Sequence, residues 1–205
     1  PVTTPPVQVD FAQAVQDTWQ SIVDDTKRLR PQARINGVTV EPMVRRTHGR
    51  ELMIGVIRDP VFGPAIVFGT GGTAVEVHRD RAVALPPLNR FLIADMIRGT
   101  RVAKLLGAFR RMPPVDMAAL EEILLRVSEL VCELPALLEM DINPLIADEN
   151  GVIAVDARVV LRPPPPQRDR YGHMAIHPYP AHLVSSWQPA SGLPVTLRPI
   201  RPEDA

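Results

Sequence analysis

The chain has 205 residues, with 23 basic and 23 acidic side chains and therefore no formal net charge at neutral pH. This length allows one large domain or a domain with an appendage, and the balanced charge argues against nucleic acid as a main partner. No apolar run could span a bilayer and no signal-peptide pattern is present, so we expect a cytoplasmic protein without a membrane partner. The single cysteine, Cys132, argues against a disulfide framework.

The first thirty residues predict an extended entry and then a helix. Residues 1–9 are rich in proline, and Asp10 can cap a helix whose apolar residues recur at helical spacing until Leu29. Because the chain starts in linker-like sequence without a methionine, we expect it to be cut from a longer protein.

The period then changes to short apolar runs separated by turn residues. Five runs predict strands, namely residues 38–44, 51–57, 65–68, 74–77 and 82–85. No helix is predicted between them, which implies an antiparallel meander. The connection Gly69-Thr70-Gly71-Gly72 can present several backbone N–H groups to an anion, or it can be a plain flexible turn.

Two helices follow. Residues 89–99 predict a shorter one that continues loosely through 101–106, and Asp116 can cap a longer one. The apolar stripe of the longer helix consists of Leu120, Ile123, Leu124, Val127, Leu130, Val131 and Leu134. This stripe predicts core packing and implies no chemistry.

Residues 138–161 predict a β-hairpin. Asp148-Glu149-Asn150-Gly151 has the residue preferences of a type I turn, and the runs on both sides alternate like half-buried strands. With Asp148 opposite Gly151, the predicted apolar face holds Met140, Ile142, Pro144 and Ile146 opposite Val159, Ala157, Val155 and Ile153. The predicted polar face holds Glu139, Asp141, Asn143, Asp156 and Arg158.

In this register Asn143 lies directly across from Asp156. Directly opposed residues have Cβ atoms roughly 5 Å apart, which suits two oxygen ligands on one small cation. Mg²⁺ takes one or two carboxylates, keeps several waters and completes its octahedron with substrate phosphates, so the hairpin predicts a metal site for a nucleotide. The alternative is the ordinary wet face of an antiparallel sheet, and a one-residue slip would separate the two ligands onto opposite faces.

The tail after Leu161 changes in composition. Residues 162–170 predict a stiff polyproline spacer. Residues 171–193 hold three histidines whose spacing fits no zinc pattern, and their prolines and aromatics predict an extended segment pressed against a neighbouring surface. Residues 194–200 predict a final strand, which we expect to pair with a neighbouring molecule or with the domain's own sheet edge.

These motifs resemble a known family. Residues 33–161 resemble the second half of the ATP-grasp domain in NDP-forming acyl-CoA synthetases. The matching sequence segments are VEPMV, GRELMIGVIRDPVFGPAIVFGTGG, RMPPVD and EMDINPL with GVIAVDARVVL. The resemblance implies an α+β fold, in which a mainly antiparallel sheet carries helices on one face. It also places the family's metal pair on Asn143 and Asp156, the same pair that the hairpin register selects.

The resemblance implies further roles position by position. The hinge that holds adenine falls on Glu41, Met43 and Val44, and the acidic residue near the ribose falls on Glu51. Gly71 and Gly72 match the glycine segment that faces phosphate transfer. Asp141 matches an acidic position that steadies the phosphohistidine loop, which makes it the candidate catalytic residue. His48 is interpreted as a surface loop residue and not as the phosphorylated histidine.

The tail has its own resemblance. Residues 170–205 resemble the junction and first strand of a GNAT-type acetyltransferase fused behind such a synthetase, as in bacterial protein-lysine acetyltransferases of the Pat type. This organisation implies a partial ATP-grasp domain at 1–161, a Pro-rich linker at 162–193 and a truncated acetyltransferase start at 194–205. The acetyl-CoA-binding loop and catalytic groups of the acetyltransferase lie outside the sequence.

Three functions follow as hypotheses. The first is a nucleotide-binding module that regulates the fused acetyltransferase, the second is part of an active ADP-forming acyl-CoA synthetase, and the third is a non-catalytic scaffold. The implied cofactors are Mg²⁺ and ATP or ADP, with CoA or acetyl-CoA in the parent protein. The implied partners are the nucleotide, the CoA-binding synthetase domain and GNAT domain of the same parent, a protein substrate of the GNAT domain, and a second copy in a homo-oligomer. Because the family's phosphate-binding lysines and histidine-bearing domain are absent, we expect the fragment alone to be inactive.

Overall fold

The computed structural model describes residues 12–72, 80–163, 171–190 and 192–200, and the chain divides into two compact units, 1–45 and 46–205. In the first unit, helix α1 (Ala12–Leu29) confirms the predicted helix; its basic last turn, Lys27 and Arg28, complements the helix dipole. The predicted strand 38–44 is wrong, because these residues form no strand. The described part of this unit offers no second strand for pairing, and Pro42 has no N–H to donate.

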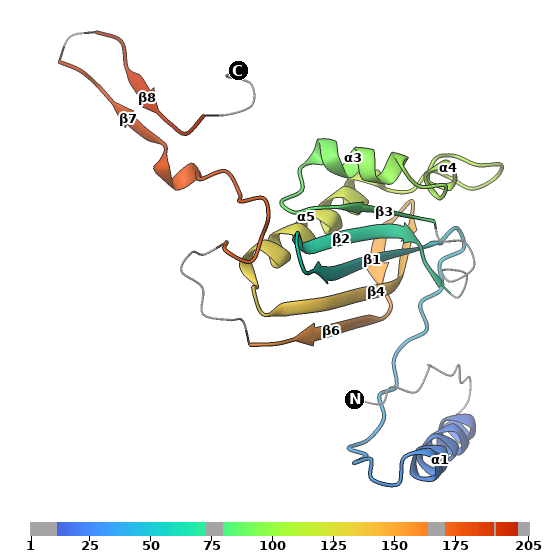
Figure 1. Cartoon of the computed structure of the whole chain (residues 1–205). Helices are drawn as coiled ribbons and strands as arrows, with labels where there is room; N and C mark the ends of the chain where they lie inside the picture. The colour runs from blue at the N-terminus through green and yellow to red at the C-terminus, as the bar shows by residue number, and fades with distance from the viewer. Residues whose placement is uncertain (1–11, 73–79, 164–170, 191, 201–205) are drawn as a thin grey trace. The chain divides into compact units, whose positions relative to one another are not determined.

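The second unit is built on an antiparallel sheet (Figure 1). Its order is β3 (Arg81–Ala84), β2 (Gly63–Thr70), β1 (Arg50–Asp59), β4 (Leu137–Asp148) and β5 (Gly151–Ala154), with β6 (Ala157–Leu161) also paired to β4. The predicted strands 51–57, 65–68 and 82–85 are confirmed as β1, β2 and β3, whereas 74–77 lies outside the described residues. Because β4 returns beside β1, these two strands form the centre of the sheet.

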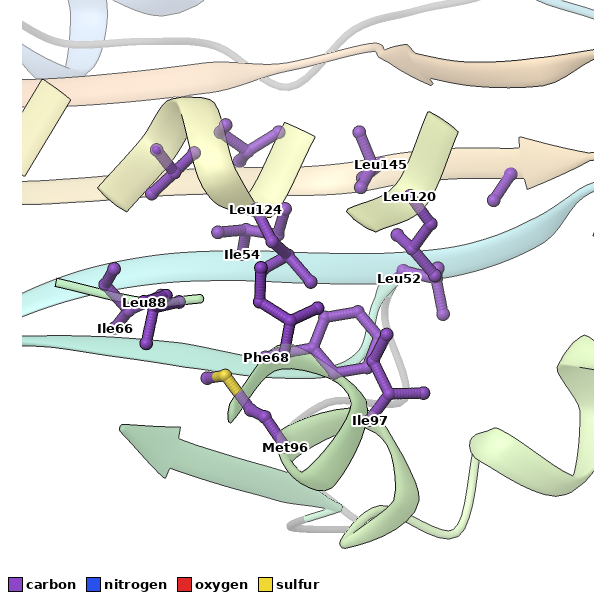
Figure 2. Packing of buried hydrophobic residues seen from close by; sticks show 14 of the residues in the cluster. Leu52, Ile54, Ile66, Phe68, Leu88, Met96, Ile97, Leu120, Leu124 and Leu145 are labelled. Atoms are coloured by element: carbon purple, nitrogen blue, oxygen red, sulfur yellow. The ribbon is translucent and has the colours of Figure 1, made fainter. Parts of the chain in front are cut away.

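Helices cover one face of this sheet. They are α3 (Arg90–Arg98), α4 (Ala103–Leu106) and α5 (Met117–Glu133). The side chains of Asn89 and Asp116 cap α3 and α5 by accepting from Leu92 N–H and Ala119 N–H, as their residue types predict. Figure 2 shows the core between helices and strands, which includes Leu52, Ile54, Ile66, Phe68, Leu120 and Leu124. The observed architecture is the expected α+β class.

The predicted hairpin register is confirmed. The structure pairs Met140 with Val159, Asp141 with Arg158, Ile142 with Ala157, Ile146 with Ile153, and Asp148 with Gly151. Of the predicted apolar face, Val155, Ala157 and Val159 are exposed. In β4 this face is wrong in its second half, because Leu145 and Ala147 are fully buried while Pro144 and Ile146 are only partly buried. The reason is a β-bulge. Against β1, Leu52 pairs with Leu145 but Ile54 pairs with Ile142, so one extra residue in β4 inverts the alternation.

The tail forms its own small sheet. Strand β8 (Val195–Leu197) confirms a strand within 194–200, but it pairs with β7 (Ser185–Trp187) and not with the edge of the larger sheet. A short 3₁₀ turn, η2 (Ala181–Leu183), precedes β7. In the described part of the tail the expected extended path is interrupted by η2, whereas β7 is itself extended. No helix in the described ranges is long and apolar enough to cross a membrane.

Residues 171–174 of the tail lie against α5 of the same unit. Tyr171 donates its hydroxyl to the Glu133 carboxylate at 3.0 Å, and His173 Nε2 lies 3.0 Å from the Val131 carbonyl oxygen. Both partners are in the last turn of α5, where helix carbonyls lack partners within the helix. His173 and Met174 are buried. This part of the tail is pressed against a surface, as its composition predicts.

Candidate functional site

The sheet face opposite α3 and α5 carries polar residues from several strands. Gly55 of β1 lies between Val67 of β2 and Asp141 of β4, and Asp141 lies between Gly55 and Arg158 of β6. A groove of about 200 Å³ follows these rows. Its lining includes Met53, Gly55, Val67, Arg81, Asp141 and Arg158. The groove therefore has an apolar floor with charged side chains around it.

The glycine segment folds closely onto β1 and β4. Gly71 N–H donates to the Glu51 carbonyl oxygen at 2.8 Å, and Gly72 N–H donates to Asn143 Oδ1 at 2.8 Å. A Cβ at Gly71 would overlap the backbone of Leu52, and a Cβ at Gly72 would overlap the Glu51 carboxylate. Gly72 also has φ +72°, where a side chain is disfavoured. The segment is thus a packed connection that brings Glu51, Gly71, Gly72 and Asn143 together.

These contacts change how the glycine segment can act. The two N–H groups of Gly71 and Gly72 already have acceptors inside the protein, so they do not form the open anion cradle that the GTGG pattern allows. Their role in the structure is to hold the Asn143 side chain. Because Gly72 donates, the amide oxygen of Asn143 must face it, which fixes the orientation of the amide group.

The two predicted metal ligands are neighbours. Asn143 N–H donates to the Asp156 carbonyl oxygen at 3.1 Å, and Val155 N–H donates to the Pro144 carbonyl oxygen at 3.0 Å. Asp156 is exposed, between β5 and β6. The Asn143 oxygen has two lone pairs and gives one to Gly72 N–H, so the second is available to a cation.

Asp141 lies beside this pair. Burial raises the pKa of its carboxyl group, the carboxylate of Asp156 raises this pKa further, and the guanidinium of Arg158 lowers it. The net result is a raised pKa, so the negative charge of Asp141 and Asp156 is incompletely compensated. A cation near both carboxylates would relieve their repulsion.

The donor set fits a hard divalent cation. The described residues contain no group of three or more His, Cys, Asp or Glu side chains that could hold a metal ion, so a cation bound here would need further ligands from water or phosphate. An amide oxygen from Asn143 and carboxylates from Asp156 and Asp141 are the oxygen ligands that Mg²⁺ takes when waters and phosphates complete its shell. These residues could therefore hold Mg²⁺ together with a phosphorylated ligand.

The other predicted residues lie elsewhere. Glu41 and Met43 are exposed and Val44 is half-buried, and all three belong to the first unit. His48 Nδ1 lies 2.9 Å from Glu149 Oε1, so His48 contacts the turn of the β4–β5 hairpin.

Sequence reasoning missed Asp80. Its carboxylate accepts from the Thr70 hydroxyl at 2.9 Å, from Arg101 N–H at 2.6 Å and from Val102 N–H at 2.8 Å. In the sequence Asp80 is one of four residues in a predicted turn. Nothing in the local pattern marks it, because two of its three donors lie more than twenty residues away.

Comparisons with known proteins point to one family. A family model described as an ATP-grasp domain matches residues 6–161. The beta subunit of an ADP-forming acetate–CoA ligase from Pyrococcus furiosus is 38% identical over 155 residues, which are 76% of this chain and 66% of that subunit. An ADP-forming acetate–CoA ligase from Archaeoglobus fulgidus is 41% identical over 147 residues, which are 72% of this chain and 21% of that protein.

Solved structures agree with the sequence relatives. An acetyl-coenzyme A synthetase from Ca. Korarchaeum cryptofilum, in complex with coenzyme A and Mg-AMPPCP, is 34% identical with a TM-score of 0.60, and the match covers 77% of this chain and 67% of that one. A second structure of this synthetase, with coenzyme A and Ca-AMPCP, is 38% identical with a TM-score of 0.63 and covers 73% and 65%. The chain spans about two thirds of the Pyrococcus subunit and about one fifth of the Archaeoglobus protein.

Proposed function

Since the chain belongs to the ATP-grasp family, with ADP-forming acyl-CoA ligases as its relatives, we propose that it is the nucleotide-binding half of an acyl-CoA synthetase-like module. One observation carries this proposal. Glu51, Gly71, Gly72 and Asn143 converge through short hydrogen bonds and close packing, with Asp156 adjacent to Asn143. An ordinary wet sheet face would not need two glycines packed against a strand to hold one amide side chain.

In this proposal Asn143 and Asp156 hold Mg²⁺ and Asp141 lies beside them. When bound, the metal neutralises charge on the nucleotide phosphates, which is the main electrostatic demand of phosphoryl transfer. The protein residues orient the ligands: Gly72 N–H fixes the Asn143 amide, and the Glu51 carboxylate lies next to Gly72. In this proposal Glu51 faces the ribose. Glu41, Met43 and Val44 of the first unit hold the adenine.

We further propose that this module belongs to a longer protein and regulates a fused GNAT acetyltransferase. In this proposal the ATP-grasp part covers 1–161, the linker covers 162–193 and the acetyltransferase begins at 194–205. The contacts of Tyr171 and His173 with α5 support this role, because they tie the chain beyond residue 161 to the nucleotide-binding unit. CoA or acetyl-CoA and a protein substrate would then bind to other parts of the parent.

A second candidate is an active ADP-forming synthetase, which converts acyl-CoA, ADP and phosphate to carboxylate, CoA and ATP. The relatives favour it, because they are named as ADP-forming ligases. Turnover of acyl-CoA with ADP and phosphate by the full-length protein would support the synthetase. A nucleotide-dependent acetyltransferase rate without such turnover would support regulation.

The first experiment is calorimetric titration of Mg²⁺–ATP and Mg²⁺–ADP into the full-length protein. We expect Asn143→Ala and Asp156→Ala each to weaken binding at least about tenfold, because each removes an oxygen ligand. Asp95→Ala is the matched control, since its exposed carboxylate pairs only with Arg98 on α3 in the described contacts. Circular dichroism checks that all variants are folded. A folded wild-type protein that binds neither nucleotide would contradict the proposal and leave the scaffold function.

A further inference from the structure

Asp80 joins the end of β2, which leads into the glycine segment of the candidate site, to the turn before α4. Thr70, at the end of β2, donates both its backbone N–H to the Asp80 carbonyl oxygen at 3.1 Å and its hydroxyl to the Asp80 carboxylate. The same carboxylate accepts the N–H groups of Arg101 and Val102, which precede α4. Asp80 thus ties the start of the glycine segment to the turn before a helix of the core layer.

The charge of Asp80 strengthens this tie. Burial acts to raise the pKa of its carboxyl group, but the N–H of Arg101, the hydroxyl of Thr70 and the N–H of Val102 lower it by more. The net pKa is lowered, so the group is a carboxylate at neutral pH. Hydrogen bonds to an ionised acceptor are roughly twice as strong as those between neutral groups.

From Thr70 a short path leads to Asn143. Gly71 and Gly72 follow Thr70 directly, and Gly72 N–H holds the Asn143 amide oxygen. The segment has little freedom to shift, because a Cβ at Gly69 would overlap the Asp80 carbonyl and a Cβ at Gly71 would overlap β1. The location of the Gly72 N–H group therefore depends on the place where Asp80 holds Thr70.

We propose that Asp80 is a positioning residue, which acts through Thr70 and the glycine segment to aim the Asn143 oxygen at the bound cation. This inference rests on the proposed nucleotide and Mg²⁺ site. It predicts that loosening the Thr70–Asp80 contact affects the Mg²⁺-dependent part of nucleotide binding, whereas the Mg²⁺-independent part is unchanged. A merely structural role would change thermal stability without that selectivity.

The test compares two substitutions at Thr70. Thr70→Val keeps the β-branched shape and removes the hydroxyl, while Thr70→Ser keeps the hydroxyl. Calorimetry on the full-length protein measures the affinity for ADP with Mg²⁺ and with EDTA. We expect Thr70→Val to lose about tenfold of the gain in affinity that Mg²⁺ gives, with the EDTA value unchanged, and Thr70→Ser to retain that gain.

Asp80→Asn provides the second arm. An amide cannot offer two oxygens to the three donors, so we expect it to lose the Mg²⁺-dependent gain as Thr70→Val does. Asp59→Asn is the matched control, because the Asp59 carboxylate accepts the N–H groups of Val61 and Phe62 at the opposite end of the β1–β2 hairpin. It should leave both affinities unchanged.

The outcomes separate the two proposals. If folded wild-type protein binds ADP no better with Mg²⁺ than with EDTA, the metal site and the role of Asp80 both fail. If Mg²⁺ strengthens ADP binding by the same factor in the wild type and in Thr70→Val, only the role of Asp80 is overturned. If Thr70→Val weakens binding alike with Mg²⁺ and with EDTA, Asp80 is a structural residue and the positioning role is again overturned.

Discussion

At the residue scale, the carboxylates of the candidate site explain why a cation is expected there. Burial and the charge of Asp156 raise the pKa of Asp141, and Arg158 offsets only part of that effect. Glu139 Oε2 lies 3.6 Å from Arg158 Nη2. The Arg158 guanidinium therefore pairs with the Glu139 carboxylate as well as with Asp141. The site therefore carries excess negative charge at neutral pH.

That charge predicts a pH-dependent effect of Asp141→Asn. The pKa of Asp141 is raised by folding above its ordinary 3.8, so the ionised group lowers stability as pH increases through this range. At pH 7 we expect Asp141→Asn to raise the Tm by about 1–2 °C, and the gain to vanish below the ordinary pKa. Thermal unfolding between pH 3 and 8, without divalent cations, measures it.

The control is Asp95→Asn, which removes an exposed carboxylate that pairs with Arg98. It should not raise the Tm at pH 7, because an exposed ion pair contributes little and has no uncompensated charge to relieve. A Tm of Asp141→Asn equal to or below that of the wild type at pH 7 would show that the two aspartates do not repel in the folded protein.

At the element scale, the sequence predicted the helix starts and the hairpin register, which depend on residues that are close together in the chain. Helices α3 and α5 begin at their capping residues, and the turn predicted at Asp148–Gly151 fixes the hairpin register. That register alone placed Asn143 beside Asp156. Local chemistry is sufficient here because a cap or a turn acts within three or four residues.

Most of what the sequence did not predict involves a partner that is remote in the sequence. The change of face after Ile142 depends on pairing with β1. The β7–β8 pair is an exception, because these strands are close in the sequence and β7 was not predicted as a strand. The bond from Gly72 to Asn143 spans 71 residues, and the bonds to Asp80 cross to the turn before α4. Periodicity cannot report such contacts, because it describes one segment at a time.

The β4–β5 turn gives a prediction at this scale. Asp148 is 3% exposed, and Arg46 Nη1 contacts both of its carboxylate oxygens at 2.9 and 3.0 Å. We expect Arg46→Gln to lower the Tm at pH 7 by about 5 °C, because a buried carboxylate loses its counter-charge. Arg98→Gln, which breaks an exposed pair with Asp95, should cost much less.

The same variant has a defined pH dependence. Burial acts to raise the pKa of Asp148, but Asn150 and Arg46 lower it by more, so its charged form stabilises the fold above the ordinary pKa of 3.8. This contribution is lost as pH falls through the lowered pKa. The Tm difference between Arg46→Gln and wild type should therefore shrink in acid, and a difference that is constant from pH 3 to 7 would contradict the ion-pair explanation.

At the scale of the whole molecule, residues 171–174 fasten the tail to α5 and β2. His173 Nε2 must carry a proton to donate to the Val131 carbonyl oxygen, which is one of the last carbonyls of α5. Gly63, the first residue of β2, has no room for a side chain, because a Cβ there would overlap the His173 carbonyl oxygen. Residues 171–174 are therefore held from two sides.

We expect His173→Ala to release this attachment. Met174 N–H donates to the Tyr171 carbonyl oxygen at 2.9 Å, and its amide hydrogen exchange should accelerate about tenfold or more when His173 no longer anchors the segment. Exchange in the peptide that covers 171–176, followed by mass spectrometry, measures the effect. His182→Ala is the control, because His182 is exposed in η2. Unchanged exchange in His173→Ala would mean that other contacts hold the tail.

The central position of β1 between β2 and β4 has a consequence for biosynthesis. The β1–β2 hairpin can form as soon as both strands leave the ribosome, but β4 is made only after β3, α3, α4 and α5. Until then β1 has an unpaired edge of apolar residues, which is a template for aggregation. The nascent chain should therefore depend on chaperones longest while residues 60–136 are being translated, and joining of β4 to β1 should be the slow step of folding.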